Sequence, residues 1–106
     1  MKKCVYLAGP ISGNTLETLA NIRRGLKATC KAIKAGYAVF CPHLDYSLNL
    51  VADDGDVLTV EEYQANSMAI LEKMDEVWVL RDWEGSRGTK AEIARAQELG
   101  IPVRFL

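Results

Sequence analysis

Residues 77–100 read VWVLRDWEGSRGTKAEIARAQELG, and this stretch decides the fold. It opens with Val77–Leu80, a short continuous apolar run of the kind found in buried parallel strands. A polar, glycine-containing loop follows, and the residues from Thr89 to Leu99 are then typical of a helix, with Gly100 just past its end. Open α/β sheets bind their ligands at loops that leave a parallel strand and enter a helix.

The same alternation of strand and helix extends over the rest of the chain. Further strands are predicted from short apolar runs bounded by glycine or proline, at residues 5–8, 37–40 and 102–106. Further helices are predicted from capping boxes, one that pairs Asn14 with Glu17 and one that pairs Thr59 with Glu62. We therefore predict a single domain over residues 1–106 of the α/β class, doubly wound and flavodoxin-like or Rossmann-like, with a mostly parallel sheet of about four strands and three helices.

Two segments carry further expectations. In the first helix, apolar residues recur at spacings of three and four, the pattern of a helix that packs one face on a core: Leu19, Ile22, Leu26, Cys30 and Ile33. Residues 43–58 have no clear period and are predicted to be a long loop, either functional or mobile. Its acidic residues, Asp53, Asp54 and Asp56, do not match a calcium-binding loop and are expected to be solvated.

Composition excludes several classes of function. The net charge is −1 with no basic stripe, which argues against binding to a nucleic-acid polymer. No apolar run approaches the roughly 20 residues of a membrane span, and the N-terminal apolar run is too short for a secretory signal, so a cytoplasmic location and no membrane partner are expected. The three cysteines form no CxxC pair and there is one histidine, so we expect buried free thiols in a reducing compartment, no metal and no organic cofactor.

The loops at the carboxyl ends of the strands are predicted to form the binding site. The strand order is expected to reverse beside the first strand and to open a crevice lined by residues 9–13, 41–43 and 82–92. The candidate substrate-binding residues in these loops are Gly9, Pro10, Ser12, His43, Asp82, Ser86, Gly88 and Thr89. With Arg87, the residues Ser86, Gly88 and Thr89 at the start of the last helix suit an anion such as a phosphate, or form an ordinary N-cap beside a solvated arginine. Residues 9–13 also fit a plain turn, and His43 also fits an ordinary loop histidine.

Glu92 and Tyr6 are the candidate catalytic residues, and each has two interpretations. Thr89 and Glu92 have the spacing of a capping box, so the carboxylate can simply cap its helix. Alternatively Glu92 borders the sheet-facing side of the helix and acts as a nucleophile, with the helix N-terminus favouring its ionised form. Tyr6 lies in a strand expected to be buried on both faces, so its hydroxyl needs a partner, either in the core or in orienting a catalytic carboxylate.

The chain resembles the nucleoside 2-deoxyribosyltransferase superfamily, particularly its short phage and bacterial members. The resemblance lies in motifs found in the same order over nearly the whole chain: Tyr6-Leu7-Ala8-Gly9-Pro10, Asp75–Leu80, Gly88-Thr89-x-x-Glu92 with Ala96, and Gly100-Ile101-Pro102-Val103. It implies that Glu92 attacks the anomeric carbon of a nucleoside or nucleoside 5′-monophosphate, releases the base and passes the sugar to a second base or to water. It also implies that Tyr6 orients Glu92, that Ser86 contacts a 5′-phosphate, and that a homo-oligomer, a dimer or larger, completes the pocket.

The chain also departs from that family. The second acid of the family falls at Ser67, which cannot protonate a leaving base as a carboxylic acid does. Asp45 and Asp82 are both candidates to replace it, and the sequence does not choose between them. Ser12 stands where the nucleotide-hydrolysing branch has an arginine. The predicted function is cleavage or transfer of an N-glycosidic bond, and the alternatives are a non-catalytic nucleotide-binding module, perhaps regulatory, and a structural or assembly protein on the same fold.

Overall fold

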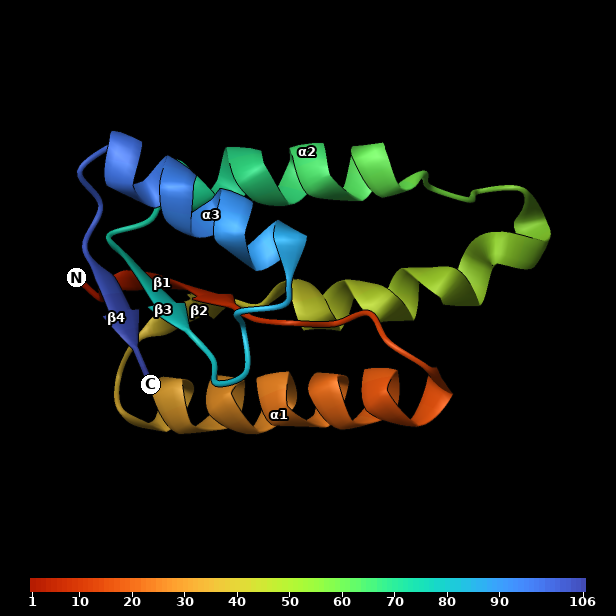
Figure 1. Ribbon diagram of the computed structural model, residues 1–106, viewed down its shortest axis with the longest axis horizontal. Coiled ribbons are helices and arrows are strands. Elements are labelled where there is room, and N and C mark those ends of the chain that lie inside the picture. The colour runs from red at the N-terminus through yellow and green to blue at the C-terminus, as the bar shows by residue number, and fades with distance from the viewer.

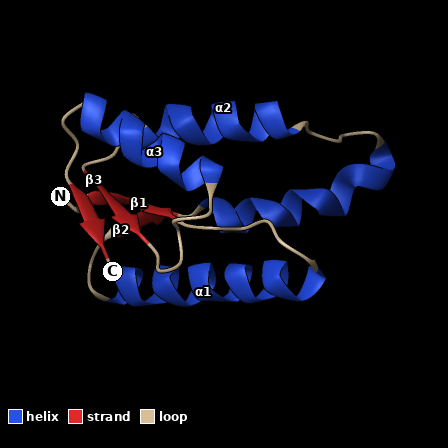
Figure 2. Ribbon diagram, viewed as in Figure 1, coloured by secondary structure: helices blue, strands red, loops and turns tan.

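The computed structural model describes the backbone of residues 1–106 and every side chain except that of Ala52. Helices cover both faces of a four-stranded parallel sheet (Figure 1, Figure 2). The strands are β1 (Cys4–Ala8), β2 (Ala38–Phe40), β3 (Glu76–Val79) and β4 (Val103–Phe105). The helices are α1 (Thr15–Lys34), the 3-10 helix η1 (Pro42–Asp54), α2 (Val60–Leu71) and α3 (Arg87–Glu98). The predicted doubly wound α/β class is confirmed.

The strand order is β2-β1-β3-β4, and every neighbouring pair is parallel. The chain leaves β1 for β2 on one side and later returns to place β3 on the other, so Tyr6 lies between Phe40 and Val77 in the sheet. This is the predicted reversal beside the first strand. The reversal separates the loop that follows β1 from the loop that follows β3, and a crevice opens at the carboxyl ends of these two strands.

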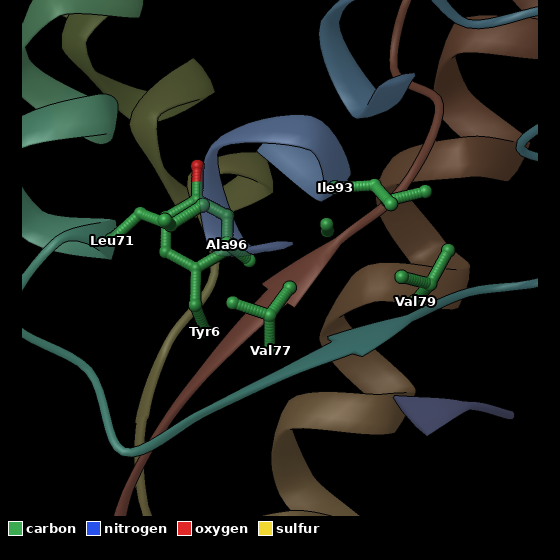
Figure 3. Packing of buried hydrophobic residues seen from close by; sticks show 7 residues of the cluster. Tyr6, Leu71, Val77, Val79, Ile93 and Ala96 are labelled. Carbon is green, nitrogen blue, oxygen red and sulfur yellow. The ribbon is translucent and has the colours of Figure 1, made fainter. Parts of the chain in front are cut away.

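Each face of the sheet has its own core, because side chains alternate along a strand. On the α1 side the buried cluster is Val5, Leu7, Ala32, Cys41 and Trp78. On the side of α2 and α3 it is Tyr6, Ala8, Leu71, Val77, Val79, Ile93 and Ala96, and Figure 3 shows the Tyr6 hydroxyl pointing away from Val77. The phenol of Tyr6 therefore enters the layer that also holds α3.

The prediction of a long loop over residues 43–58 is wrong for most of that segment. Pro42–Asp54 forms a 3-10 helix, which extends beside α1 in Figure 1. Pro42 has the fixed φ and the missing N–H that suit a first helical position, and Asp45 is an acidic residue in the first turn. The segment has no single buried apolar stripe, because Leu44, Leu48 and Leu50 are all exposed, so periodicity gave no helical signal.

The apolar stripe expected to pack α1 on the core does not do so. The α1 residues that are buried are instead Asn21, Gly25, Thr29 and Ala32. Small side chains bring α1 close to the sheet and to η1, whereas Leu19, Leu26 and Ile33 are exposed. The helix was predicted correctly, but its inward face was not.

The thiols are also less uniform than predicted. All three cysteines are free, but Cys41 is buried, Cys4 is partly buried and Cys30 is exposed. The expectation of buried thiols is wrong for Cys30, which lies on the same outer side of α1 as the apolar stripe.

Among the described residues, no helix has the length and apolar character needed to cross a membrane.

Candidate functional site

A cavity of about 1090 Å³ lies at the carboxyl ends of β1 and β3. Its walls come from the loop after β1, the first turns of α1, the start of η1, one side of α2, and the loop and first turns of α3. Segments that are distant in sequence thus surround one space, and Glu92 lines it. The volume is large enough for a nucleoside or nucleotide, since small-molecule pockets usually measure about 300–1,000 Å³.

Glu92 does not cap its helix. The N-cap of α3 is Ser86, whose side-chain oxygen accepts a hydrogen bond from the Thr89 N–H at 3.2 Å. Arg87 is the first helical residue, so Glu92 lies in the second turn, beyond the first-turn positions that a capping box uses. The predicted capping box of Thr89 and Glu92 is therefore wrong. The helix begins one turn earlier, and Ser86 is the N-cap that accepts the hydrogen bond from the Thr89 amide.

The carboxylate of Glu92 is bound from the sheet. The Tyr6 hydroxyl donates a hydrogen bond to Glu92 Oε2, which joins β1 to α3. Tyr6 is fully buried and Glu92 is half-buried, so this bond fixes one carboxylate oxygen at the wall of the cavity.

The surroundings of Glu92 favour its protonated form. Burial raises the pKa of Glu92 from 4.5 to about 7, and the hydrogen bond from Tyr6 opposes that rise. Burial, together with the neighbouring Glu92 charge, strongly raises the pKa of Tyr6, so the phenol stays protonated and acts as a donor. The sequence predicts that the helix N-terminus favours the ionised form of Glu92, but Glu92 lies beyond the first turn, where the dipole effect has faded, and burial dominates.

Three further side chains bear on the question of the second acid. Ser67 is buried and lines the cavity. Asp45 also lines it, and burial raises the pKa of its carboxyl from the usual 3.8. Asp82 lines the rim, but its Oδ2 accepts a hydrogen bond from Arg24 Nη1 at 2.8 Å and its side chain is 79% exposed. Asp45 is therefore better placed than Asp82 to hold a proton inside the cavity.

Most of the sequence-predicted substrate-binding residues border the cavity: Gly9, Pro10, Ser12, Asp82, Ser86, Gly88 and Thr89. Gly9 is required by packing, since a Cβ there would lie 2.7 Å from Leu80 Cδ1. The Ser86 oxygen accepts from both the amide and the hydroxyl of Thr89, at 3.2 and 2.9 Å, which leaves the Ser86 O–H to serve as a donor.

The structure places His43 outside the cavity lining. It is buried beneath α1, with Nε2 3.0 Å from the Pro10 carbonyl oxygen and Nδ1 3.3 Å from Cys41 Sγ. A carbonyl only accepts, so Nε2 carries the proton and Nδ1 accepts from the Cys41 thiol. Burial lowers the pKa of His43 and raises that of Cys41, so both are neutral and hold the loop after β1 in place.

Sequence reasoning missed the contribution of α1 to the site. Glu17, Asn21 and Arg24 line the cavity from that helix. Asn21 Nδ2 donates to the Ile11 carbonyl at 3.2 Å, which anchors the loop after β1. The available signal was the occurrence of Asn21 and Arg24 in a helix whose apolar residues are mostly leucines. The apolar stripe is the stronger pattern, and it led to the wrong inward face.

The fold of the chain matches that of a solved enzyme. Over 96% of this chain and 70% of the other, the structure superposes on the 2-deoxyribosyltransferase from the psychrotolerant bacterium Bacillus psychrosaccharolyticus, with a TM-score of 0.65 and 21% identity. That enzyme is described as a biocatalyst for the synthesis of antiviral and antitumoral nucleosides. The fold of the chain is therefore that of a nucleoside deoxyribosyltransferase.

The sequence also assigns the chain to a family. The chain belongs to the DUF4406 family, a domain family of unknown function whose model matches residues 3–105. No curated protein matches the sequence.

Proposed function

We propose that the protein cleaves or transfers the N-glycosidic bond of a nucleoside or nucleoside 5′-monophosphate, with Glu92 as the nucleophile. The observation that carries this proposal is the hydrogen bond from the buried Tyr6 hydroxyl to Glu92 in the wall of a nucleoside-sized cavity. A carboxylate fixed through one oxygen can direct the other at an anomeric carbon. The likeness of the fold to a 2-deoxyribosyltransferase supports the same class of reaction.

The proposed reaction has two steps. In the first, a Glu92 oxygen forms a bond to the anomeric carbon, the bond from that carbon to the base nitrogen breaks, and the departing base takes up a proton. In the second, water or another base attacks the same carbon and gives its proton back to the group that protonated the departing base, the ester to Glu92 breaks, and the carboxylate is regenerated. Glu92 must be ionised for the first step, so its pKa of about 7 predicts that the active form of the nucleophile is lost as the pH falls below about 7.

The proton for the departing base has a proposed source in Asp45. Ser67, at the position of the family's second acid, holds no acidic proton of suitable pKa. Asp45 is half-buried in the same cavity, and its raised pKa favours the protonated form that a general acid needs. We assign the role to Asp45 over Asp82, since Asp82 is paired with Arg24.

The proposed binding groups are the residues that border the cavity near Glu92. Gly9, Pro10 and Ser12 form one side of the sugar pocket, and Ser86, Gly88 and Thr89 offer a hydroxyl and backbone amides to a 5′-phosphate. Arg87, which also borders the cavity, adds a positive charge at the start of α3. His43 is left out of this set because it lies behind the loop after β1.

A second candidate function is binding of a nucleotide without catalysis. It is favoured by Ser67, a buried hydroxyl where a catalytic acid is expected. Such a module would bind a nucleotide in the same cavity and release no base.

The experiment that separates the two is base release from a panel of nucleosides and 5′-monophosphates, followed by chromatography, with wild type beside Glu92→Ala and calorimetry on the same ligands. Base release by the wild type and none by a folded alanine variant is the expected result. Nucleotide binding by an inert wild type would instead support the binding module. Addition of a free acceptor base distinguishes transfer from hydrolysis.

A further inference from the structure

The loop after β3 contains a residue with a left-handed backbone. Asp82 has a φ of 63°, and among the residues that the structure describes it is the one non-glycine residue with a positive φ. Glycine adopts this conformation freely, whereas a residue with a Cβ adopts it at a cost, which is smaller for aspartate and asparagine than for most others. Such a conformation persists where neighbouring contacts hold it, and for Asp82 those contacts come from Arg24.

The loop after β3 extends toward α1, where the guanidinium of Arg24 binds it (Figure 1). Arg24 Nη1 donates to Asp82 Oδ2 at 2.8 Å and to the Arg81 carbonyl oxygen at 3.4 Å. One nitrogen thus binds both a side chain and the main chain of the loop. An isolated ion pair whose side chains are 41% and 79% exposed would contribute little, but a guanidinium has five donors in a fixed fork and can join several partners.

The same guanidinium is also connected to the loop after β1. Arg24 Nη2 donates to Asn21 Oδ1, and Asn21 Nδ2 donates to the Ile11 carbonyl oxygen at 3.2 Å. Asn21 and Arg24 are three residues apart on α1, so their side chains lie on one side of the helix, and both line the cavity. A continuous series of hydrogen bonds therefore runs from Ile11 in one cavity loop to Asp82 in the other.

These two loops carry the residues to which substrate binding is assigned. The sheet fixes both loops where they begin, since the Leu80 N–H donates to the Ala8 carbonyl oxygen at 2.8 Å. Further along, one loop carries Ser12, and the other leads to Ser86, the N-cap of α3. The distance between these two groups across the cavity depends on how the loops are held beyond the sheet.

We propose that Arg24 is a positioning residue, which acts through Asn21 and Asp82 to set the separation of the two substrate-binding loops. This inference rests on the proposed function, which assigns the sugar and the phosphate to those loops. Arg24 touches no reacting atom in this role, and Tyr6 and Glu92 are held by β1 and α3. Loss of Arg24 should therefore weaken substrate binding more than it slows the chemical step.

Steady-state kinetics test this division between KM and kcat. With the nucleoside or 5′-monophosphate that the base-release panel identifies as the best substrate, Arg24→Ala should raise KM about tenfold or more and lower kcat less than about threefold. Arg23→Ala is the matched control, because Arg23 is the neighbouring arginine of α1, is exposed and lies outside the cavity lining. It removes the same charge and should keep the wild-type KM.

Substitutions at Asp82 separate a positioning role from direct binding of the substrate by Arg24. Asp82→Ala removes the carboxylate and leaves a Cβ in the left-handed region, so KM should rise as in Arg24→Ala. The Arg24→Ala, Asp82→Ala double variant should be no worse than either single variant, because both remove one contact. In Asp82→Gly the backbone is relieved of its strain, so KM should lie nearer to the wild-type value. Both Asp82 variants keep Arg24, so they test the contact even if Arg24→Ala does not fold.

Hydrogen exchange tests the same contact without a substrate. The Ser86 N–H donates to the Trp83 carbonyl oxygen at 2.8 Å, so its exchange rate reports on the opening of the loop after β3. The Ser86 amide should exchange about tenfold faster in Arg24→Ala and in Asp82→Ala, and at the wild-type rate in Arg23→Ala. A protein that releases no base can still be measured in this way, so failure of the proposed function is distinguishable from failure of this inference.

Several results would overturn the proposal. A lower KM in Asp82→Ala would mean that Asp82 competes with the substrate for Arg24, and that Arg24 binds the substrate directly. Additive losses in the double variant would mean that the two residues act separately. A lower kcat at an unchanged KM in Arg24→Ala would assign Arg24 to the chemical step. An unchanged exchange rate of the Ser86 amide in Arg24→Ala would mean that Arg24 does not hold the loop.

Discussion

The Tyr6 hydroxyl donates a hydrogen bond to Glu92 Oε2, although the two residues are 86 positions apart. The strand β1 holds Tyr6 at the centre of the sheet, and α3 brings Glu92 over its carboxyl end. The bond thus joins a buried central strand to the carboxylate that lines the cavity. The proposed chemistry depends on this pair.

The pH dependence of base release is the first expected consequence. The pKa of Glu92 is about 7 and the nucleophile must be ionised while Asp45 must be protonated, so kcat/KM should show a bell-shaped pH dependence in which the midpoint near 7 belongs to Glu92. In Tyr6→Phe the bond that lowers the Glu92 pKa is lost, so this midpoint should move to higher pH and kcat should fall. Rate profiles between pH 5 and 9 for both proteins measure this, and a reduced rate at an unmoved midpoint would mean that Tyr6 acts only in packing.

Stability should depend on pH through the same carboxyl group. The pKa of Glu92 is higher in the folded protein than its ordinary value of 4.5, so the folded state keeps a proton that the unfolded chain releases. The contribution of the Glu92 carboxyl group to the free energy of unfolding is complete below pH 4.5 and is lost as the pH rises to about 7. Relative to Glu92→Gln, the wild type should lose up to about 3 kcal/mol of unfolding free energy over this range. Urea unfolding of both proteins at several pH values gives the difference, and a constant difference would contradict the raised pKa.

Asp45→Asn should slow base release by about a hundredfold or more if Asp45 protonates the departing base. The loss should be greatest for bases that leave poorly, because these depend most on a proton donor. Asp82→Asn is the matched control, and since Asp82 is held at the rim by Arg24, its effect should fall on KM and not vary with the leaving base. Equal losses for good and poor leaving bases in Asp45→Asn would remove the acid role from Asp45.

Gly25→Ala should destabilise the protein even though alanine is the better helix former. A Cβ at Gly25 would lie 2.6 Å from His43 Cγ, and both the imidazole and its hydrogen bond to Pro10 would have to shift. The expected cost is about 1–3 kcal/mol. Gly88→Ala is the control, because a Cβ there meets nothing within 4 Å and should add up to about 1 kcal/mol of helix stability. Denaturant unfolding of the two variants should therefore give changes of opposite sign.

The sequence predicts the structure correctly wherever the pattern lies within a short stretch of the chain. The apolar runs identify all four strands to within two residues at each end, and the capping boxes at Asn14 and Thr59 are both present in the structure. The cavity-bordering loops after β1 and β3 were also predicted, because the carboxyl ends of parallel strands meet at one edge.

The features that the sequence misassigned depend on tertiary contacts. The orientation of α1 is set by how closely Gly25 and His43 approach, not by where its leucines lie. The placement of His43 behind the loop after β1 depends on the Pro10 carbonyl, which no sequence pattern indicates. The sequence predicts Thr89 as the N-cap that pairs with Glu92, whereas the helix begins one turn earlier at Ser86, which places Glu92 in the wall of the cavity.

The most direct test of the nucleophilic role of Glu92 is the rate of base release from Glu92→Ala, measured with enzyme in excess over substrate, with and without azide. We predict a loss on the order of a thousandfold or more relative to wild type. Azide should restore part of the rate, because this small anion can enter the space left by the carboxylate and attack the anomeric carbon to give a glycosyl azide. Base release from the folded alanine variant at the wild-type rate, with no response to azide, would contradict the proposal.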